Sequence, residues 1–161
     1  MEQVGISNRL RELKKLKGKT FDPQIMEVER GAVRRWADAI DDPNPLYQDV
    51  EYAKSRGYGE IIAPPGFFGW AVEGKGFREI IADVAKCMAQ AGYPLLLDAG
   101  IEYEFYIPIC AHDMLIASSS VGDISKRGGM VLIILETVFL KQNGDKVAWR
   151  RKMLAFLSPK V

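Results

Sequence analysis

The sequence predicts an α+β fold in which a curled antiparallel sheet surrounds a buried helix. The first half of the chain contains segments with the apolar spacing of helices, and a nearly all-apolar stretch follows Pro64-Pro65. From Leu95 onward the pattern changes to that of strands, and Ile101, Tyr103 and Phe105 alternate with polar residues. A length of 161 residues fits one domain.

Composition and charge exclude several functional classes. With 22 basic and 21 acidic residues the chain has a formal charge of +1, so no global field attracts nucleic acid or an anionic membrane. No apolar run reaches the roughly 18 residues of a membrane span, and no secretory signal opens the chain, so we expect a cytoplasmic protein. Cys87 and Cys110 lack the spacing of a zinc site, and no metal is expected.

Helical segments are expected in three places in the first 60 residues. Residues 8–17 predict a basic terminal helix with Leu10, Leu13 and Leu16 on one side, which we separate as an extension (1–17) from the domain (18–161). After an extended piece at 24–28, the segment "RGAVRRWADAID" predicts an amphipathic helix, and residues 49–59 predict a short one. The buried stripe of the amphipathic helix consists of Val33, Trp36, Ala37 and Ile40.

Two further helices are expected before the strands. Pro65 is suited to the first turn of a helix, and the apolar residues after it, from Phe67 to Val72, predict the buried helix inside the sheet. Residues 77–91 predict an amphipathic third helix or a lid-like insertion. The remaining strands are predicted at 114–125, 130–140 and 146–157, with a hairpin turn at 143–145.

The chain contains no nucleophile elbow, Walker loop or dinucleotide fingerprint. Its only histidine, His112, lies in a polar turn and is interpreted as a turn residue. The stretches "DPNPLY" at 42–47 and "IAPPGF" at 62–67 resemble the MaoC-like hot-dog dehydratases, and most closely their FAS1-type N-terminal branch. The resemblance extends from about Lys17 to Ser158 and implies a hot-dog fold.

The resemblance also implies a site. Enzymes of the (R)-specific enoyl-CoA hydratase kind pair an aspartate with a histidine five residues later, and these positions match Asp42 and Tyr47, with Asn44 between them. A phenol with a pKa near 10 is a poor acceptor of a water proton. The family's carbonyl-binding position matches Gly66, with Phe67 beside it, at the expected helix start.

Lys54 and Arg56 in the next loop are weaker candidates for contacts with coenzyme A phosphates. We therefore expect a subunit of an enoyl-CoA hydratase or 3-hydroxyacyl-thioester dehydratase whose dyad is incomplete, acting on a coenzyme A thioester without a cofactor. Its partner would be a hot-dog subunit that carries the Asp/His pair. The alternatives are a self-sufficient homodimeric hydratase or thioesterase that uses Asp42 and Tyr47, and a non-catalytic acyl-CoA binding protein.

Overall fold

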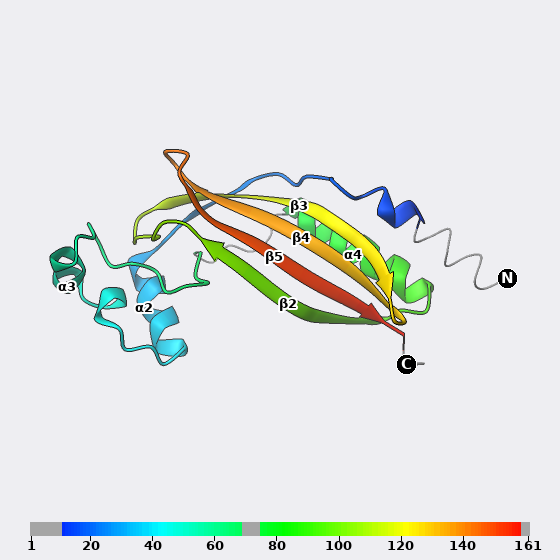
Figure 1. Cartoon of the computed structure of the whole chain (residues 1–161), viewed down its shortest axis with the longest axis horizontal. Helices are drawn as coiled ribbons and strands as arrows, with labels where there is room; N and C mark the ends of the chain where they lie inside the picture. The colour runs from blue at the N-terminus through cyan, green and yellow to red at the C-terminus, as the bar shows by residue number, and fades with distance from the viewer. Residues whose placement is uncertain (1–10, 69–74, 159–161) are drawn as a thin grey trace.

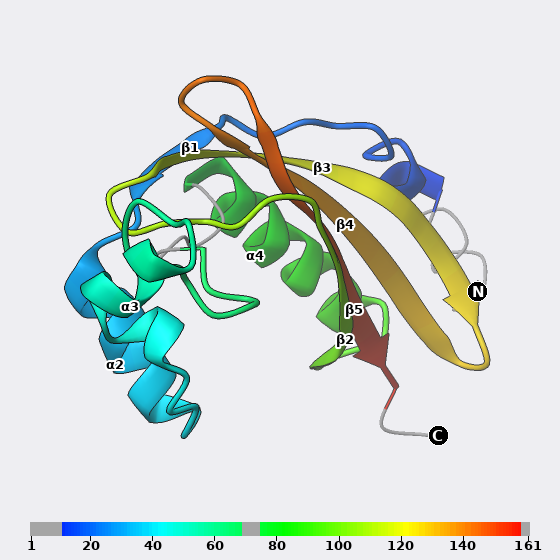
Figure 2. The same cartoon turned by 60° about the vertical axis from the view of Figure 1, so that its left-hand side comes forward.

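The computed structural model describes residues 11–68 and 75–158 of the chain, and it contains one curled antiparallel sheet. The strand order is β1-β3-β4-β5-β2, and the sheet curves around helix α4 (Figures 1 and 2). The strands are β1 (Gln24–Glu27), β2 (Leu95–Phe105), β3 (Met114–Arg127), β4 (Met130–Lys141) and β5 (Lys146–Leu157). This confirms the predicted hot-dog architecture of a curled antiparallel sheet around a helix.

Helix α4 (Lys75–Gln90) is the element that the sheet encloses. Its residues Val84 and Met88 are buried against the strands, while residues such as Asp83 and Lys86 on its other face are exposed. We call the resulting cluster the helix-side core; its fully buried members include Met88, Val131, Ile133, Leu135 and Phe156. The helix predicted at 77–91 is confirmed, and of its two interpretations, a third helix or a lid-like insertion, the structure supports the first.

The helix predicted to start at Pro65 is wrong where the structure describes it. Residues 64–67 form a turn, in which the Phe67 amide donates to the Pro64 carbonyl at 3.0 Å. Gly66 has φ +88°, a left-handed conformation that an α-helix does not contain. Phe67 and Phe68 are nevertheless buried, because this loop packs into the core. The rest of the predicted helix, 69–72, lies outside the described residues.

The opposite end of the molecule is built from short elements. These are α2 (Arg30–Ala39), a single 3₁₀ turn η1 (Pro45–Tyr47) and α3 (Val50–Ser55). They enclose what we call the pocket-side core, whose members include Val33, Ala37, Tyr47, Phe67, Phe68 and Phe139. Trp36 packs against this core as predicted. Ile40 does not and is 48% exposed, because α2 ends at Ala39 and Ile40 leaves the buried stripe.

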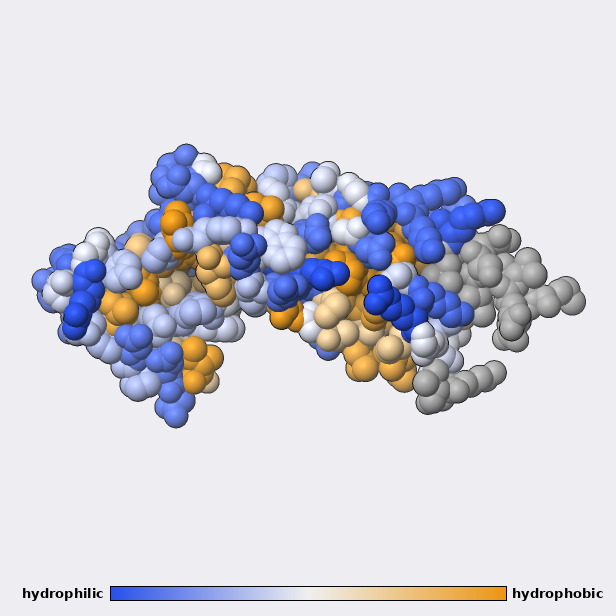
Figure 3. Space-filling view, in the orientation of Figure 1, coloured by the Kyte–Doolittle hydropathy of each residue, from blue (hydrophilic) through white to orange (hydrophobic). Residues whose placement is uncertain are grey.

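The two edges of the sheet differ. β1 is a four-residue strand, whereas β2 is an eleven-residue strand that pairs with β5 on one side only. Large apolar side chains are exposed along β2 and just beyond it: Leu95, Leu96, Leu97, Ile101, Phe105, Tyr106 and Ile107. In the orientation of Figure 1, Figure 3 shows apolar surface along the lower margin of the sheet, where β2 runs.

The N-terminal helical segment and the β4–β5 hairpin turn were also predicted from the sequence. At the N-terminal end, residues 11–14 are helical and Leu13 and Leu16 pack on the helix-side core, while Leu10 lies outside the described residues. The β4–β5 hairpin turns at Asn143–Asp145 as predicted, with Gly144 at φ +90°.

Across the described ranges no helix combines the length and apolarity needed to cross a bilayer.

Candidate functional site

The segment Asp42–Tyr47 is fixed by hydrogen bonds within itself. Helix α2 ends at Ala39, and Asp41, two residues later, has φ +53° and turns the chain. The Asp42 side chain then accepts a hydrogen bond from the Asn44 amide at 3.1 Å, and the Asn44 side chain accepts one from the Leu46 amide at 3.0 Å. The second of these bonds caps η1, the turn that ends at Tyr47, and the first fixes the chain just before it. The segment is non-helical up to Asn44, as predicted, and the 3₁₀ turn at Pro45–Tyr47 is the one addition.

The structure brings Asp42, Asn44 and Tyr47 together. Tyr47 is buried, with 7% of its surface exposed. Burial raises the pKa of the Tyr47 phenol, the nearby Asp42 carboxylate raises it further, and a hydrogen bond with the Asn44 side chain opposes the rise. The phenol is therefore neutral at physiological pH. It can donate a hydrogen bond, but it is a poor base.

Tyr47 lies in the wall of an apolar pocket of about 230 Å³. One wall comes from the loop Ile62–Pro65 together with Phe67, and the other comes from the end of β2 and the loop after it, residues 105–109. The residues around the pocket are aliphatic, proline and aromatic, and among their side chains only those of Tyr47 and Tyr106 carry a polar atom. Such a pocket favours an apolar ligand that carries few polar atoms.

Gly66 and Phe67 lie in a turn, whereas the sequence predicted a helix start at this position. Phe67 lines the pocket and packs against Trp36, with ring centroids 5.5 Å apart. Gly66 lies between two lining residues but belongs to a turn, and the described helix nearest to it begins at Lys75. The premise that Gly66 sits just inside a helix start is wrong, because Gly66 lies in a turn with φ +88°. Any contact between a ligand carbonyl and the amides of this turn stays a prediction.

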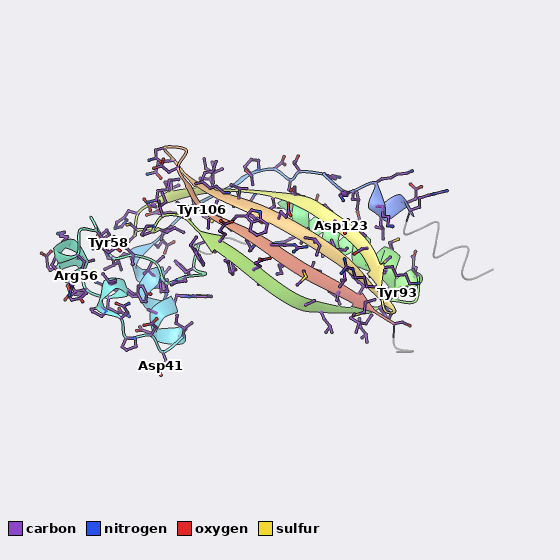
Figure 4. The ribbon with its side chains drawn as sticks, viewed as in Figure 1. Asp41, Arg56, Tyr58, Tyr93, Tyr106 and Asp123 are labelled. Atoms are coloured by element: carbon purple, nitrogen blue, oxygen red, sulfur yellow. The ribbon has the colours of Figure 1, made fainter. Side chains whose placement is uncertain are left out.

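Lys54 and Arg56 are not among the residues that line the pocket. The Lys54 ammonium pairs with Glu51 at 2.9 Å, and the Arg56 guanidinium donates to the Tyr52 hydroxyl at 3.1 Å and stacks over its ring. Figure 4 shows Arg56 at the outer end of the molecule, in the α3 region, and Tyr106 nearer the strands. Their contact with coenzyme A stays a prediction.

His112 occupies a turn, as the sequence predicted, with φ +70°. Its Nδ1 lies 3.6 Å from a Glu27 carboxylate oxygen, and it does not line the pocket.

The residues that sequence reasoning missed are Ile107, Pro108 and Ile109, which form the second wall. The available signal was that apolar residues continue past the end of the strand, in "YIPI".

The fold and the site define a class: a hot-dog protein with a MaoC-type Asp-x-Asn-Pro segment beside an apolar pocket. The family described as "FAS1-like, dehydratase domain region" matches residues 15–150, and the chain belongs to that family. It is 32% identical over 139 residues to a UPF0336 protein of Thermobifida fusca, covering 85% of this chain and 88% of the relative.

Two further similarities concern multi-subunit proteins. A probable enoyl-CoA hydratase alpha subunit of Thermomonospora curvata is 27% identical over 146 residues, covering 80% of this chain and 44% of that protein. The crystal structure of the ChsH1-ChsH2 complex from Mycobacterium tuberculosis has a chain that matches with a TM-score of 0.76. That match covers 97% of this chain and 98% of that one at 20% identity, and at this identity it supports the fold alone.

Proposed function

We propose that this protein is a subunit of an enoyl-thioester hydratase or 3-hydroxyacyl-thioester dehydratase whose catalytic base comes from a second hot-dog chain. The observation that carries the proposal is the state of Tyr47. Asp42 and Asn44 adopt an ordered arrangement beside an apolar pocket, and the position that should hold a proton acceptor holds a buried phenol with a raised pKa.

The chemistry explains why this substitution matters. Hydration adds the hydroxyl of water to the β-carbon of the enoyl thioester and a proton to its α-carbon, so a group must first accept a proton from the water. Loss of a well-placed general base costs about 10² to 10⁴ in rate. In this proposal the partner's Asp/His pair activates the water, while the apolar pocket of this chain holds part of the acyl group.

The free edge of β2 supports a partner. An unpaired strand with exposed apolar side chains on both faces is a template for another strand, and such edges are seldom left open in soluble proteins. Phe105, Tyr106 and Ile107 belong both to this exposed edge and to the pocket wall. A chain that pairs with β2 would therefore also border the pocket. The alpha-subunit designation of the relative from Thermomonospora curvata agrees with this proposal.

The test is co-expression with a hot-dog protein that carries Asp-x-Asn-Pro-x-His and is encoded beside this chain. We expect the two chains to co-purify and to hydrate crotonyl-CoA or a longer enoyl-CoA together. Ile101→Lys, on the free edge of β2, should prevent co-purification. Ile25→Lys, at an exposed position on the opposite edge strand β1, is the matched control and should not. Failure of the wild-type chains to associate, or equal behaviour of the two variants, would contradict the proposal.

A further inference from the structure

The two walls of the pocket are joined to each other by backbone hydrogen bonds. The Ala63 amide donates to the Ile109 carbonyl at 2.7 Å, and the Ala111 amide donates to the Ile61 carbonyl at 2.9 Å. Ile62 and Cys110 form the antiparallel bridge between these two bonds. This is a short contact between two irregular loops, and it has no longer ladder to support it. The shape of the pocket therefore depends on whatever holds these loops in place.

A carboxylate anchors each loop. Asp113 accepts the Cys110 amide at 2.7 Å and the ammonium of Lys141, at the end of β4, also at 2.7 Å. Glu60 accepts the amide of Ile61 at 2.8 Å and forms an ion pair with Arg30, at the start of α2. Each carboxylate thus joins the backbone amide of a residue next to a pocket wall, Ile61 or Cys110, to a basic side chain on a regular element.

Both carboxylates of these anchors are largely screened from water. The side chains of Lys141, Asp113 and Glu60 are only 16%, 15% and 14% exposed, whereas the Arg30 side chain is 42% exposed. Burial raises the pKa of the Cys110 thiol, Lys141 lowers it, and both Asp113 and Glu60 raise it, so the charges of both anchors act on this residue. Partly buried ion pairs of this kind are costly to break from one side, because the remaining charge has no compensating partner.

We infer that Asp113 with Lys141, and Glu60 with Arg30, form a pair of carboxylate anchors that position the two walls of the pocket. Neither carboxylate lines the pocket. They are positioning residues that act through the loops 61–65 and 107–111. The inference rests on the proposed function only for the identity of the ligand; the geometry of the anchors is independent of it.

The test is amide hydrogen exchange of the whole chain, comparing wild type with Asp113→Asn, Lys141→Met and Glu60→Gln. We expect the amides of Ala63 and Ala111 to exchange at least tenfold faster in each variant, with amides of the β4–β5 ladder unchanged. Glu51→Gln, which breaks the exposed ion pair with Lys54 on α3, is the control and should leave the loop amides at their wild-type rates. Unchanged loop amides, or equal acceleration of the β4–β5 amides, would overturn the inference.

A ligand-binding experiment distinguishes a failure of the inference about the anchors from a failure of the proposed function. With octanoyl-CoA as the probe, we expect the dissociation constant to rise at least fivefold in Asp113→Asn and to recover in part in Asp113→Glu. Faster loop exchange with an unchanged dissociation constant would overturn the positioning role. If the wild-type chain, alone and with its partner, did not bind octanoyl-CoA, the proposed function would fail, and the exchange experiment would still decide the inference about the anchors.

Discussion

The two cores of the molecule differ in how they are built and in what they leave open. The helix-side core is a helix packed on strands, and the residues at its centre, such as Met88 and Phe156, are fully buried. The pocket-side core is closed by turns and short helices, and it leaves a pocket of about 230 Å³. Regular packing fills space, whereas irregular segments held by side-chain hydrogen bonds can leave a shaped pocket.

A polar row marks the border between the two cores. Thr137, 1% exposed, lies on the same face of β4 as Leu135 of one core and Phe139 of the other. Its hydroxyl lies 2.9 Å from that of Ser119 on β3 and accepts a hydrogen bond from Arg150 on β5 at 3.1 Å. Because these groups satisfy one another across three strands, the row can separate two apolar clusters without leaving the Thr137 hydroxyl unsatisfied.

The largest expected effect tests the helix-side core. Phe156→Ala removes a fully buried ring from β5 and should lower the free energy of unfolding by about 3–5 kcal/mol. Urea denaturation followed by tryptophan fluorescence measures this change. Leu97→Ala, on the exposed part of β2, is the control and should cost less than about 0.5 kcal/mol. In the folded fraction, Phe156→Ala should leave ligand binding at the pocket unchanged; a loss of binding would mean that the two cores are coupled.

A smaller effect on stability and a larger one on the site are expected at Asn44. Asn44→Ala removes the cap of η1 and should cost about 0.5–2 kcal/mol of stability. Because Asn44 also hydrogen-bonds with Tyr47, the variant should weaken thioester binding by more than the much more destabilising Phe156→Ala does. Isothermal titration of both variants with octanoyl-CoA gives this ranking, and the reverse order would contradict the separation of the two regions.

The smallest effect concerns the Tyr47 phenol at alkaline pH. Its pKa is raised in the folded protein, so the folded state resists deprotonation more than the unfolded chain does. The contribution of the neutral Tyr47 phenol to the free energy of unfolding is fully present below the pKa of the unfolded chain, about 10. It is lost as the pH rises through the higher pKa of the folded protein. Tyr47→Phe should therefore reduce the fall in unfolding free energy between neutral and strongly alkaline pH, measured by urea denaturation at each pH. An equally steep fall in the variant would show that Tyr47 does not contribute to it.

Much of the fold could be predicted from the spacing of apolar residues along the sequence. The period-two residues around Tyr103 and the helical spacing of residues 77–91 predict a strand and a helix that the structure contains. Spacing alone does not distinguish a helix inside the sheet from a lid over it, because both need one apolar face. The loop at Gly66 looks like a buried helix because its neighbours are apolar. Its backbone partners, such as the Ile109 carbonyl, come from segments distant in the sequence.

The candidate site was predictable to a similar extent. Asp42, Asn44 and Tyr47 are close in sequence, and the turn chemistry of the two prolines and Asn44 places them together. The second wall of the pocket, at 107–109, comes from a distant part of the chain, and no local pattern relates it to Tyr47. The carboxylate anchors at Glu60 and Asp113 likewise depend on tertiary contacts with Arg30 and Lys141.

The most direct test of the central claim is the rate at which the isolated chain hydrates crotonyl-CoA, followed by loss of the enoyl absorbance. The claim is that the pocket is present and the proton acceptor is missing. We predict that the wild-type chain alone stays at the background rate, and that Tyr47→His, which restores an imidazole beside Asp42, raises the rate by about 10² or more. Turnover by the wild-type chain alone at about 1–10³ per second, abolished by Asp42→Asn, would contradict the account.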